Sequence, residues 1–457
     1  MIRLCITSQT PPVRPVGEHR PAPSAVWQAG RDYVPQVGGV VPMMSALLRS
    51  SLGHWVAPNP RWVALGAPEL PSEFATSEGY TVETVALEPQ VRSGYTRFKD
   101  ALWRSFHGPS GLEPFALEDY SAYVEYNHRT AQHLLRHRGA YDLFYVNDFQ
   151  LLLVGGLVGA AAPAILRWHI PLEFRGYPEP VRRFFLRSME GFDAIVVSTR
   201  GALEELIRFG FRGRAFQVYP YVDPAVHRPA PPGDVRRFRE RFGLGERPYV
   251  LSVGRMDPVK RQDLLLQAFS RLRHRFPEHR LVLVGGGSFS TQSLPGADRR
   301  SKDAVWLERI QTVLRSERLQ ESVVVAGTLS NDELGAAYDG ACALVHPAPW
   351  EGFGLVAVEA WMHGLPVIVS RGAGVAELVT DGVNGFTVPP GSVAALSARM
   401  AALFAHPDRA EQMGESGRLT ARRCHVGLAA RRLREIFQHT IKLYKIRGQE
   451  PPALLPS

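Results

Sequence analysis

Cysteine is scarce in this sequence, and long apolar runs are missing. The 457 residues include three cysteines, at Cys5, Cys342 and Cys424. They lie far apart without metal-ligand spacing, which excludes a disulfide-stapled module. The first apolar run ends before Pro11 and is too short for a signal peptide, so we expect a cytoplasmic protein. The most apolar stretch, 151–166, is too short to span a bilayer, so we expect no stable membrane insertion.

Blocks of like charge are missing as well. The chain has 53 Lys and Arg against 44 Asp and Glu, a formal net charge of +9, but the cations are scattered. Nucleic-acid-binding surfaces typically show a basic patch or stripe. Scattered arginines are explained equally well by small anionic ligands or by solvated helix faces, so we expect no nucleic-acid partner. With 45% hydrophobic residues the chain can form domains with full cores, which excludes disorder.

Short β-rich apolar runs alternate with helix-like segments along the whole chain. In the first half these runs are 4–7, 62–65, 142–146, 164–168 and 194–197. In the second half they are 249–253, 281–284, 323–326, 343–346 and 367–370. Alternation of this kind is typical of parallel sheets built from βαβ units. The sequence therefore predicts an α/β protein with two doubly wound domains.

The densest turn chemistry of the chain marks the domain boundary. Prolines and a glycine cluster at 220–224 and 229–233. We therefore predict an N-terminal, acceptor-binding domain over 1–222, a linker over 223–244 and a second, donor-binding domain over 245–425. A C-terminal helix over 426–450 is expected to return to the first domain.

Two cations follow the strand expected at 249–253. Ligands of open α/β sheets bind beyond the carboxyl ends of the strands, where Arg255 and Lys260 lie five positions apart. Together with the amides of a helix start, such a pair suits a diphosphate whose charge grows as it leaves. Ordinary surface charge is the alternative explanation.

Two carboxylates flank a glycine turn after the strand expected at 343–346. Glu351 and Glu359 lie eight positions apart around Gly352 to Leu355. Because a carboxylate accepts two hydrogen bonds from vicinal hydroxyls, each glutamate could hold one sugar ring. An exposed helix charge is the alternative for Glu359. The sequence has neither a G-x-G-x-x-G fingerprint nor a Walker loop, which disfavours dehydrogenases and NTPases. It also lacks an Asp-x-Asp triplet and Cys/His clusters, so we expect no metal requirement.

Taken in order, these motifs resemble the donor domain of retaining GT-B glycosyltransferases. The matching motifs are Gly254-Arg255 to Lys260, His346-Pro347, Glu351-x7-Glu359, Gly364-Leu365-Pro366-Val367-Ile368 and Gly385-Phe386-x-Val388. The resemblance implies the GT-B fold, an α/β fold in which two doubly wound Rossmann-like domains face a cleft. It implies that Arg255 and Lys260 hold a nucleotide diphosphate and that Glu359 holds the ribose hydroxyls. The transferred sugar would contact Glu351 and the amides of Phe353, Gly354 and Leu355.

The first half resembles trehalose-6-phosphate synthases of the same superfamily. Gly38 and Gly39 stand where that superfamily has a glycine loop that approaches the donor phosphate. The segments 99–107, 146–152, 167–171 and 218–220 then follow in the order of the family's motifs. Two positions depart from the pattern: Asn147 replaces a histidine and Phe149 replaces a tyrosine.

Acceptor-site roles follow from this second resemblance. Trp103 and Asp148 would contact the acceptor sugar, and His169 would lie beside the transferred sugar. Tyr95, one position off the expected spacing, and Arg299 or Arg300 would bind an acceptor phosphate. A position in the core is the alternative for both Trp103 and His169. A carboxylate at the carboxyl end of a strand, such as Asp148, is seldom buried without a partner.

The resemblance implies a retaining glucosyltransferase. It would move glucose from a nucleotide-diphosphate-glucose such as UDP-glucose to glucose-6-phosphate, giving trehalose-6-phosphate. The leaving phosphate would take the acceptor proton, with Asp148, His169, Arg255, Lys260 and Glu351 as the catalytic candidates. Three other acceptors stay open: glucose, glycerol phosphate and a cell-surface glycan. So do a sugar-nucleotide-binding regulatory protein, the donor base (UDP, ADP or GDP) and a homo-oligomeric state.

Overall fold

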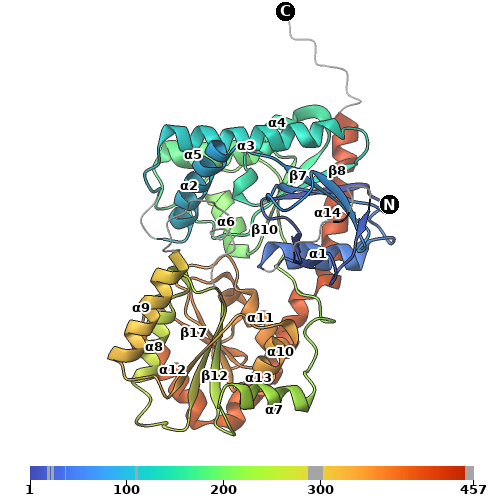
Figure 1. Ribbon diagram of the computed structural model, residues 1–457. Helices are drawn as coiled ribbons and strands as arrows, with labels where there is room; N and C mark the ends of the chain where they lie inside the picture. Colours follow the sequence, from blue (N-terminus) through green and yellow to red (C-terminus); the bar gives the residue numbers. More distant parts are fainter. Residues whose placement is uncertain (18–20, 22–24, 37, 109–111, 287–301, 448–457) are drawn as a thin grey trace, which may run out of the picture. The chain divides into compact units, whose positions relative to one another are not determined.

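The protein contains two compact units, each built round its own mainly parallel sheet (Figure 1). A computed structural model describes residues 1–17, 21, 25–36, 38–108, 112–286 and 302–447. Unit 1 contains the chain up to Pro220 and the C-terminal helix α14 (Val426–Arg447). Unit 2 contains Tyr221–His425.

Among the described residues, unit 1 has a nine-stranded sheet in which β6 and β7 are antiparallel and the other neighbours are parallel. In spatial order its strands are β11 (Ala215–Gln217), β10 (Ala194–Val197), β9 (Ala164–Arg167), β8 (Leu143–Asn147), β1 (Leu4–Ser8), β5 (Arg61–Leu65), β7 (Thr81–Val85), β6 (Glu73–Thr76) and β3 (Val26–Trp27). The central strands β1 and β8 are buried along their whole length, as expected for a sheet covered on both faces. A separate antiparallel pair joins β2 (Val13–Pro15) to β4 (Tyr33–Pro35).

Helices cover both faces of the unit 1 sheet. They are α1 (Val40–Ser51), α2 (Pro89–Phe106), α3 (Leu117–Arg136), α4 (Val154–Val158), α5 (Glu179–Glu190), α6 (Arg200–Arg208) and α14, with the 3-10 turns η1 (Phe149–Leu151) and η2 (Gly159–Ala161). One face packs Phe144 and Val146 of β8 into a core with α2 and α3. On the other face, Tyr145 contacts Phe437 of α14 at 4.9 Å between ring centroids, and α14 lies beside α1.

Unit 2 has a six-stranded parallel sheet among the described residues. Its spatial order is β14 (Val323–Gly327), β13 (Arg280–Val284), β12 (Tyr249–Val253), β15 (Ala343–His346), β16 (Val367–Ser370) and β17 (Gly385–Val388). Its helices are α7 (Pro232–Arg241), α8 (Gln262–Ser270), α9 (Lys302–Ser316), α10 (Asn331–Asp339), α11 (Leu355–Met362), α12 (Val393–Ala405) and α13 (Pro407–Ala421), with η3 (Pro258–Lys260), η4 (Gly374–Leu378) and η5 (Arg422–Cys424). Figure 1 shows α8, α9 and α12 on one side of the sheet and α10, α11 and α13 on the other.

Local sequence explains where several of these elements begin. Helix α10 starts at a capping box, in which the Ser330 hydroxyl accepts from the Glu333 N–H and the Glu333 carboxylate accepts from the Ser330 N–H. Helix α6 starts at Thr199, whose hydroxyl accepts from the Ala202 N–H. Residues 223–244, where we expected a linker, include helix α7, which packs on α10 within unit 2.

The order of the strands locates a ligand-binding edge in each unit. In unit 2 the chain starts at β12, adds β13 and β14 on one side and then returns to add β15, β16 and β17 on the other. In unit 1 it starts at β1, adds β5 and β7 on one side and later adds β8 to β11 on the other. Ligands of such sheets bind beyond the carboxyl ends of the strands where the order reverses. These switch points are β12/β15 in unit 2 and β1/β8 in unit 1.

Candidate active site

The loop after β12 carries the two cations that were expected to bind a diphosphate. Arg255 comes two residues after the strand, and its carbonyl accepts from the Gln262 side-chain amide at 2.8 Å. Asp257 caps the short helix η3 by accepting from the Val259 N–H at 3.0 Å. This turn ends at Lys260, so the cap helps to hold the ammonium at the switch point.

Lys260 forms an ion pair with Glu351, which follows the neighbouring strand β15. Nε2 of His346, the last residue of β15, lies 3.6 Å from the same carboxylate oxygen. The backbone around Glu351 is fixed by the next loop, because its N–H donates to Gly372 O and its carbonyl accepts from the Gly374 N–H. The structure thus brings together two candidates that are 91 residues apart in sequence.

Three further donor-site candidates form the entrance to helix α11. Gly354 precedes the helix with a φ of +100°, a conformation that favours glycine, and a Cβ there would lie 3.5 Å from the His346 ring. Phe353 is buried and its carbonyl accepts from the Val375 N–H at 2.8 Å, whereas Leu355 is half-buried as the first residue of the helix. The backbone conformation of the turn, and not the space beside His346, therefore favours glycine here.

Glu359 is half-buried on α11 and is held by a residue that the sequence analysis did not identify. The Tyr338 hydroxyl donates to Glu359 Oε2 at 2.8 Å. Tyr338 is fully buried and stacks on His363, whose Nδ1 lies 2.7 Å from Asp339 Oδ1. One oxygen of Glu359 is thereby used to fix the carboxylate, and Oε1 is left for other contacts. Nothing in the local sequence distinguishes Tyr338 from any tyrosine on a helix.

Asp148 lies directly after β8, at the switch point of unit 1, and is under backbone strain. Its φ of 73° and ψ of 173° belong to a region that is essentially restricted to glycine, at a cost of about 1–3 kcal/mol. The side chain is 6% exposed, and Oδ1 accepts from the His169 N–H at 3.2 Å. Burial raises the pKa of Asp148 to about 7, although hydrogen bonds from the backbone of His169, Phe149 and Ile170 oppose this shift.

His169 lies beside Asp148 and is held by its side chain as well. Its Nε2 is 3.0 Å from Oδ1 of Asn147, the residue that departs from the family's motif. Burial, and then the nearby charge of Arg167, lower the pKa of His169. Arg167 is the last residue of β9 and is fully buried. A cation at the end of a buried strand was visible in the sequence but was not identified as part of a site.

The remaining candidates of unit 1 lie in different settings. The Trp103 ring is partly buried and stacks on His107 at 3.7 Å between ring centroids. Phe106, one turn later, contacts both Phe149 and Trp168, so this end of α2 lies beside the ends of β8 and β9.

Tyr95 is a core residue. It is fully buried, its ring packs on Tyr126, and its hydroxyl has no hydrogen-bond partner in the described part of the chain. Burial raises the pKa of Tyr95 above its ordinary value. The structure therefore does not favour the expected contact between this hydroxyl and an acceptor phosphate.

Two groups of candidates complete the set. Gly38, with a φ of +110°, and Gly39 are exposed and come directly before α1, with open space around both α-carbons. Arg299 and Arg300 lie outside the described residues.

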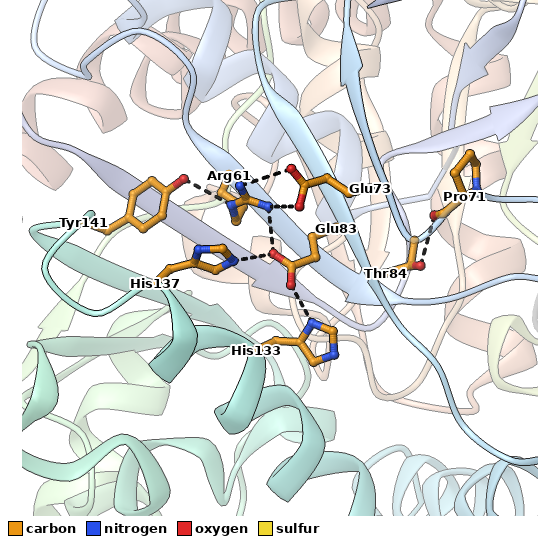
Figure 2. Close-up of polar contacts among 8 residues, drawn as sticks. All are labelled: Arg61, Pro71, Glu73, Glu83, Thr84, His133, His137 and Tyr141. Carbon is orange, nitrogen blue, oxygen red and sulfur yellow. Dashed lines mark hydrogen bonds and ion pairs between the residues drawn. The ribbon is translucent and has the colours of Figure 1, made fainter. Parts of the chain in front are cut away.

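A second polar cluster of unit 1 lies around Arg61, the first residue of β5, and Glu83 of β7 (Figure 2). Glu83 of β7 is buried and accepts from Arg61, at 2.7 Å, while His133 Nδ1 and His137 Nε2 lie 2.6 and 2.7 Å from its two oxygens. Arg61 also pairs with Glu73 at 2.8 Å. Since every oxygen of Glu83 is occupied by protein, the cluster fastens α3 to the sheet. Across the described residues, no group of three or more His, Cys, Asp or Glu side chains is arranged to hold a metal ion.

No helix in the described part of the chain is both long and apolar enough to cross a bilayer.

The family model described as "Glycosyl transferases group 1" matches residues 234–420. A GDP-mannose-dependent alpha-(1-6)-phosphatidylinositol monomannoside mannosyltransferase of Mycolicibacterium smegmatis is 34% identical over 252 residues, which are 52% of this chain and 60% of that protein. The match thus spans less than two thirds of that relative. A D-inositol 3-phosphate glycosyltransferase of Streptomyces bingchenggensis is 27% identical over 409 residues, 83% of each chain.

Solved structures give the same fold over nearly the whole chain. An alpha,alpha-trehalose 6-phosphate synthase from Burkholderia multivorans superposes with a TM-score of 0.77 at 18% identity, covering 99% of this chain and 100% of that one. A sucrose-phosphate synthase from Thermosynechococcus elongatus gives a TM-score of 0.69 at 20% identity, covering 96% and 99%. The expected fold class is confirmed: the chain has the GT-B fold, and its residues 234–420 match the family model of the glycosyl transferases group 1.

Proposed function

We propose that the protein is a retaining hexosyltransferase that uses a nucleotide-diphosphate-sugar donor. The observation that carries the proposal is the Lys260–Glu351 pair at the β12/β15 switch point. A cation suited to a diphosphate and a carboxylate suited to sugar hydroxyls are side by side there. That combination matches the bond to be broken, which joins a sugar carbon to a phosphate oxygen.

Different loops of unit 2 would bind different parts of the donor. Arg255 and Lys260 stabilise the negative charge of the departing diphosphate, together with amides at the start of α11. Glu351 binds hydroxyls of the transferred sugar. Glu359, fixed by Tyr338 through one oxygen, presents the other to the vicinal hydroxyls of the ribose. The leaving phosphate takes the acceptor proton, so no metal and no protein nucleophile is required.

The acceptor would be bound by unit 1. Asp148 and His169 orient an acceptor hydroxyl, and Trp103 offers an apolar ring face to a sugar. Glucose-6-phosphate, giving trehalose-6-phosphate, is the acceptor favoured by the order of the motifs at 99–107, 146–152 and 167–171. The burial of the Tyr95 hydroxyl weakens this choice.

An inositol phosphate is the second candidate acceptor. The relative of Streptomyces bingchenggensis, which is matched over 83% of both chains, is named for D-inositol 3-phosphate. Glucose-6-phosphate and an inositol phosphate share a ring of hydroxyls and one phosphate, so the same residues suit both.

A donor and acceptor panel tests the proposal. Nucleotide release is measured from UDP-, ADP- and GDP-glucose and from GDP-mannose, each with glucose-6-phosphate, inositol 3-phosphate, glucose or glycerol phosphate. Carbon NMR of the product gives the anomeric configuration. Retention of configuration with any acceptor supports the proposal, and inversion contradicts it. An α,α-linked disaccharide phosphate identifies the first acceptor.

The Arg255→Ala variant tests the donor site. We expect turnover to fall about 100- to 1000-fold, as when one stabiliser of transition-state charge is removed, while the melting temperature stays unchanged. Arg271→Ala, at an exposed position directly after α8, is the matched control and should keep full activity. Near-normal turnover of Arg255→Ala would refute its role.

A further inference from the structure

The proposed function does not use the guanidinium of Arg167, although this charge is expensive to bury. The side chain is 0% exposed at the end of β9. Nη2 donates to the Val218 carbonyl at 2.8 Å, but Nε and Nη1 have no hydrogen-bond partner among the described residues. Buried arginines are normally paired with a carboxylate, because an uncompensated charge in the interior is strongly destabilising. The cation therefore calls for a role.

The register of the sheet places Arg167 beside Asn147. The two residues are partners across the parallel pair β8/β9, so their side chains leave the same face. Asn147 is 1% exposed, and its Nδ2 donates to the carbonyls of Thr7 and Tyr145 at 3.2 and 3.3 Å. Two carbonyl partners fix which end of the amide is Nδ2. Oδ1 is therefore the atom that meets His169.

This orientation of Asn147 determines the tautomer of His169. An amide oxygen only accepts hydrogen bonds, so His169 Nε2, at 3.0 Å from Oδ1, carries the proton. In the neutral ring Nδ1 then carries the lone pair. Nδ1 has no hydrogen bond to any described residue and is not among the side-chain atoms sealed from solvent. It is the atom of this ring that a ligand can reach.

We propose that Asn147 and Arg167 are positioning residues that hold His169 as a neutral imidazole, protonated at Nε2 and accepting a sugar hydroxyl at Nδ1. Asn147 selects the tautomer, and the charge of Arg167 opposes a second proton on the ring. A lone pair accepts from a hydroxyl but offers nothing to a phosphate oxygen, so His169 selects the hydroxyls of the bound sugar. The ligand class rests on the proposed function, whereas the state of the ring does not.

The electrostatic surroundings of His169 agree with this role. Burial lowers the pKa of His169, and the charge of Arg167 lowers it further. Two other titratable groups lie nearby: Asp148, whose Oδ1 accepts from the His169 N–H, and Tyr145, on the same strand as Asn147. Burial raises the pKa of Tyr145 to about 12 and that of Asp148 to about 7, so both are neutral in mildly acidic solution. Arg167 is then the charged side chain of the pair β8/β9 that acts on His169.

Nitrogen-15 NMR of the histidine rings in the full chain, without substrate, tests the proposal directly. His169 is assigned by comparison with His169→Gln, and spectra are recorded from pH 5 to pH 8.5. We expect a neutral, Nε2-protonated ring in the wild type throughout the upper part of this range. Arg167→Met should raise the proton affinity of His169 about tenfold, which moves its titration to higher pH, and Arg167→Lys should restore the wild-type titration. Asn147→Ala should give a mixture of the two tautomers.

Arg183→Met, an exposed arginine of α5, is the matched control and should leave the His169 signals unchanged. A wild-type ring that is protonated at Nδ1, or that titrates at the ordinary pKa, would overturn the proposal. So would an Arg167→Met spectrum identical to that of the wild type. If Arg167→Met does not fold, the wild-type and Asn147→Ala spectra decide. A neutral Nε2-protonated ring in a protein without glycosyl transfer would refute the proposed function alone.

Discussion

Glu83 and Asp148 are both buried carboxyl groups of the unit 1 sheet, yet their surroundings are opposite. Glu83, 5% exposed, meets Arg61 and two histidines. Burial by itself would raise the pKa of Glu83, but the hydrogen bonds from His133 and His137 and the charge of Arg61 lower it to about 2. Asp148, 6% exposed, receives backbone N–H groups without a cation, and burial raises its pKa to about 7.

The backbone conformations of Glu83 and Asp148 also differ. Glu83 lies in the regular strand β7, whereas Asp148 has a conformation that is normally restricted to glycine. The end of the sheet around Arg61 is thus built for stability, because both carboxylate oxygens of Glu83 have partners. The end at the switch point keeps strain and an ionisation near neutrality, which is typical of sites where the fold sacrifices stability for function. Four predictions test this contrast.

Glu83→Gln should cause the largest change, a loss of about 3–5 kcal/mol in the free energy of unfolding. The substitution breaks a buried ion pair and leaves Arg61 with less compensation. Denaturant unfolding measures the loss. Glu78→Gln, on the turn after β6, is the control and should cost much less. Activity of the folded Glu83→Gln protein should remain normal. A loss of kcat/KM would contradict the view that the Glu83 cluster serves stability and the switch point serves activity.

Asp148→Asn should lower activity and leave stability intact. We expect kcat/KM to fall about 100-fold, because a misplaced acceptor loses the orientation on which transfer depends. Stability at pH 8 should be unchanged or higher. Asp142→Asn, at the other end of β8 and paired with Arg3, is the matched control and should keep its activity. Full activity of Asp148→Asn would remove this residue from the site.

The two carboxyl groups should give opposite dependences of stability on pH, each worth about 3–4 kcal/mol. The folded pKa of Glu83 lies below its ordinary value of 4.5, so its contribution is present above pH 4.5 and is lost as the pH falls toward 2. The folded pKa of Asp148 lies above its ordinary value of 3.8. The folded state therefore binds the extra proton between pH 3.8 and about 7, and stability falls as the pH rises through this window.

Unfolding curves of the wild type, Glu83→Gln and Asp148→Asn from pH 2.5 to pH 8 separate these two effects. Glu83→Gln should lack the acid loss, and Asp148→Asn should lack the loss toward neutral pH. Parallel curves for all three proteins would contradict the assigned ionisations.

Tyr338→Phe, which removes the hydroxyl partner of Glu359, should have the smallest effect. Glu359 has one hydroxyl partner, and a hydrogen bond to a charged group contributes about 1.5–3 kcal/mol. We expect the KM for the donor to rise about tenfold with little change in kcat. Tyr249→Phe removes a buried hydroxyl bonded to Ala337 O at 2.7 Å in the same unit and should change stability alone. Equal KM values for the two variants would show that Tyr338 does not position Glu359.

The sequence predicted the fold better than it predicted the surroundings of the site. The apolar runs at 249–253 and 281–284 correspond to β12 and β13, because continuous buried strands carry a local signal. The strand β7 gave no such signal. Its central Glu83 is buried by virtue of Arg61, 22 residues earlier, and a local pattern does not contain such a pairing.

The candidate site divides in the same way. Arg255, Lys260 and Glu351 were identified because each follows an apolar run, and Asp148 was identified from the resemblance. Tyr338 and Arg167 were missed, since each acts through a residue that is distant in the sequence: Tyr338 through Glu359, and Arg167 through its partner on β8, Asn147. Tyr95 was given a role by the resemblance, one position off the expected spacing, but the packing of α2 on α3 encloses its ring.

The sequence by itself determined the alternation of strands and helices, and with it the polar residues that stand at the carboxyl ends of the strands. Only the tertiary structure decided the ionisation and partners of these residues. Hydrophobic periodicity is a local property of the chain, whereas a pKa depends on burial and on charges that distant segments contribute. Glu83 and Asp148 are both single carboxylates in the sequence, and the folded sheet gives them pKa values of about 2 and about 7.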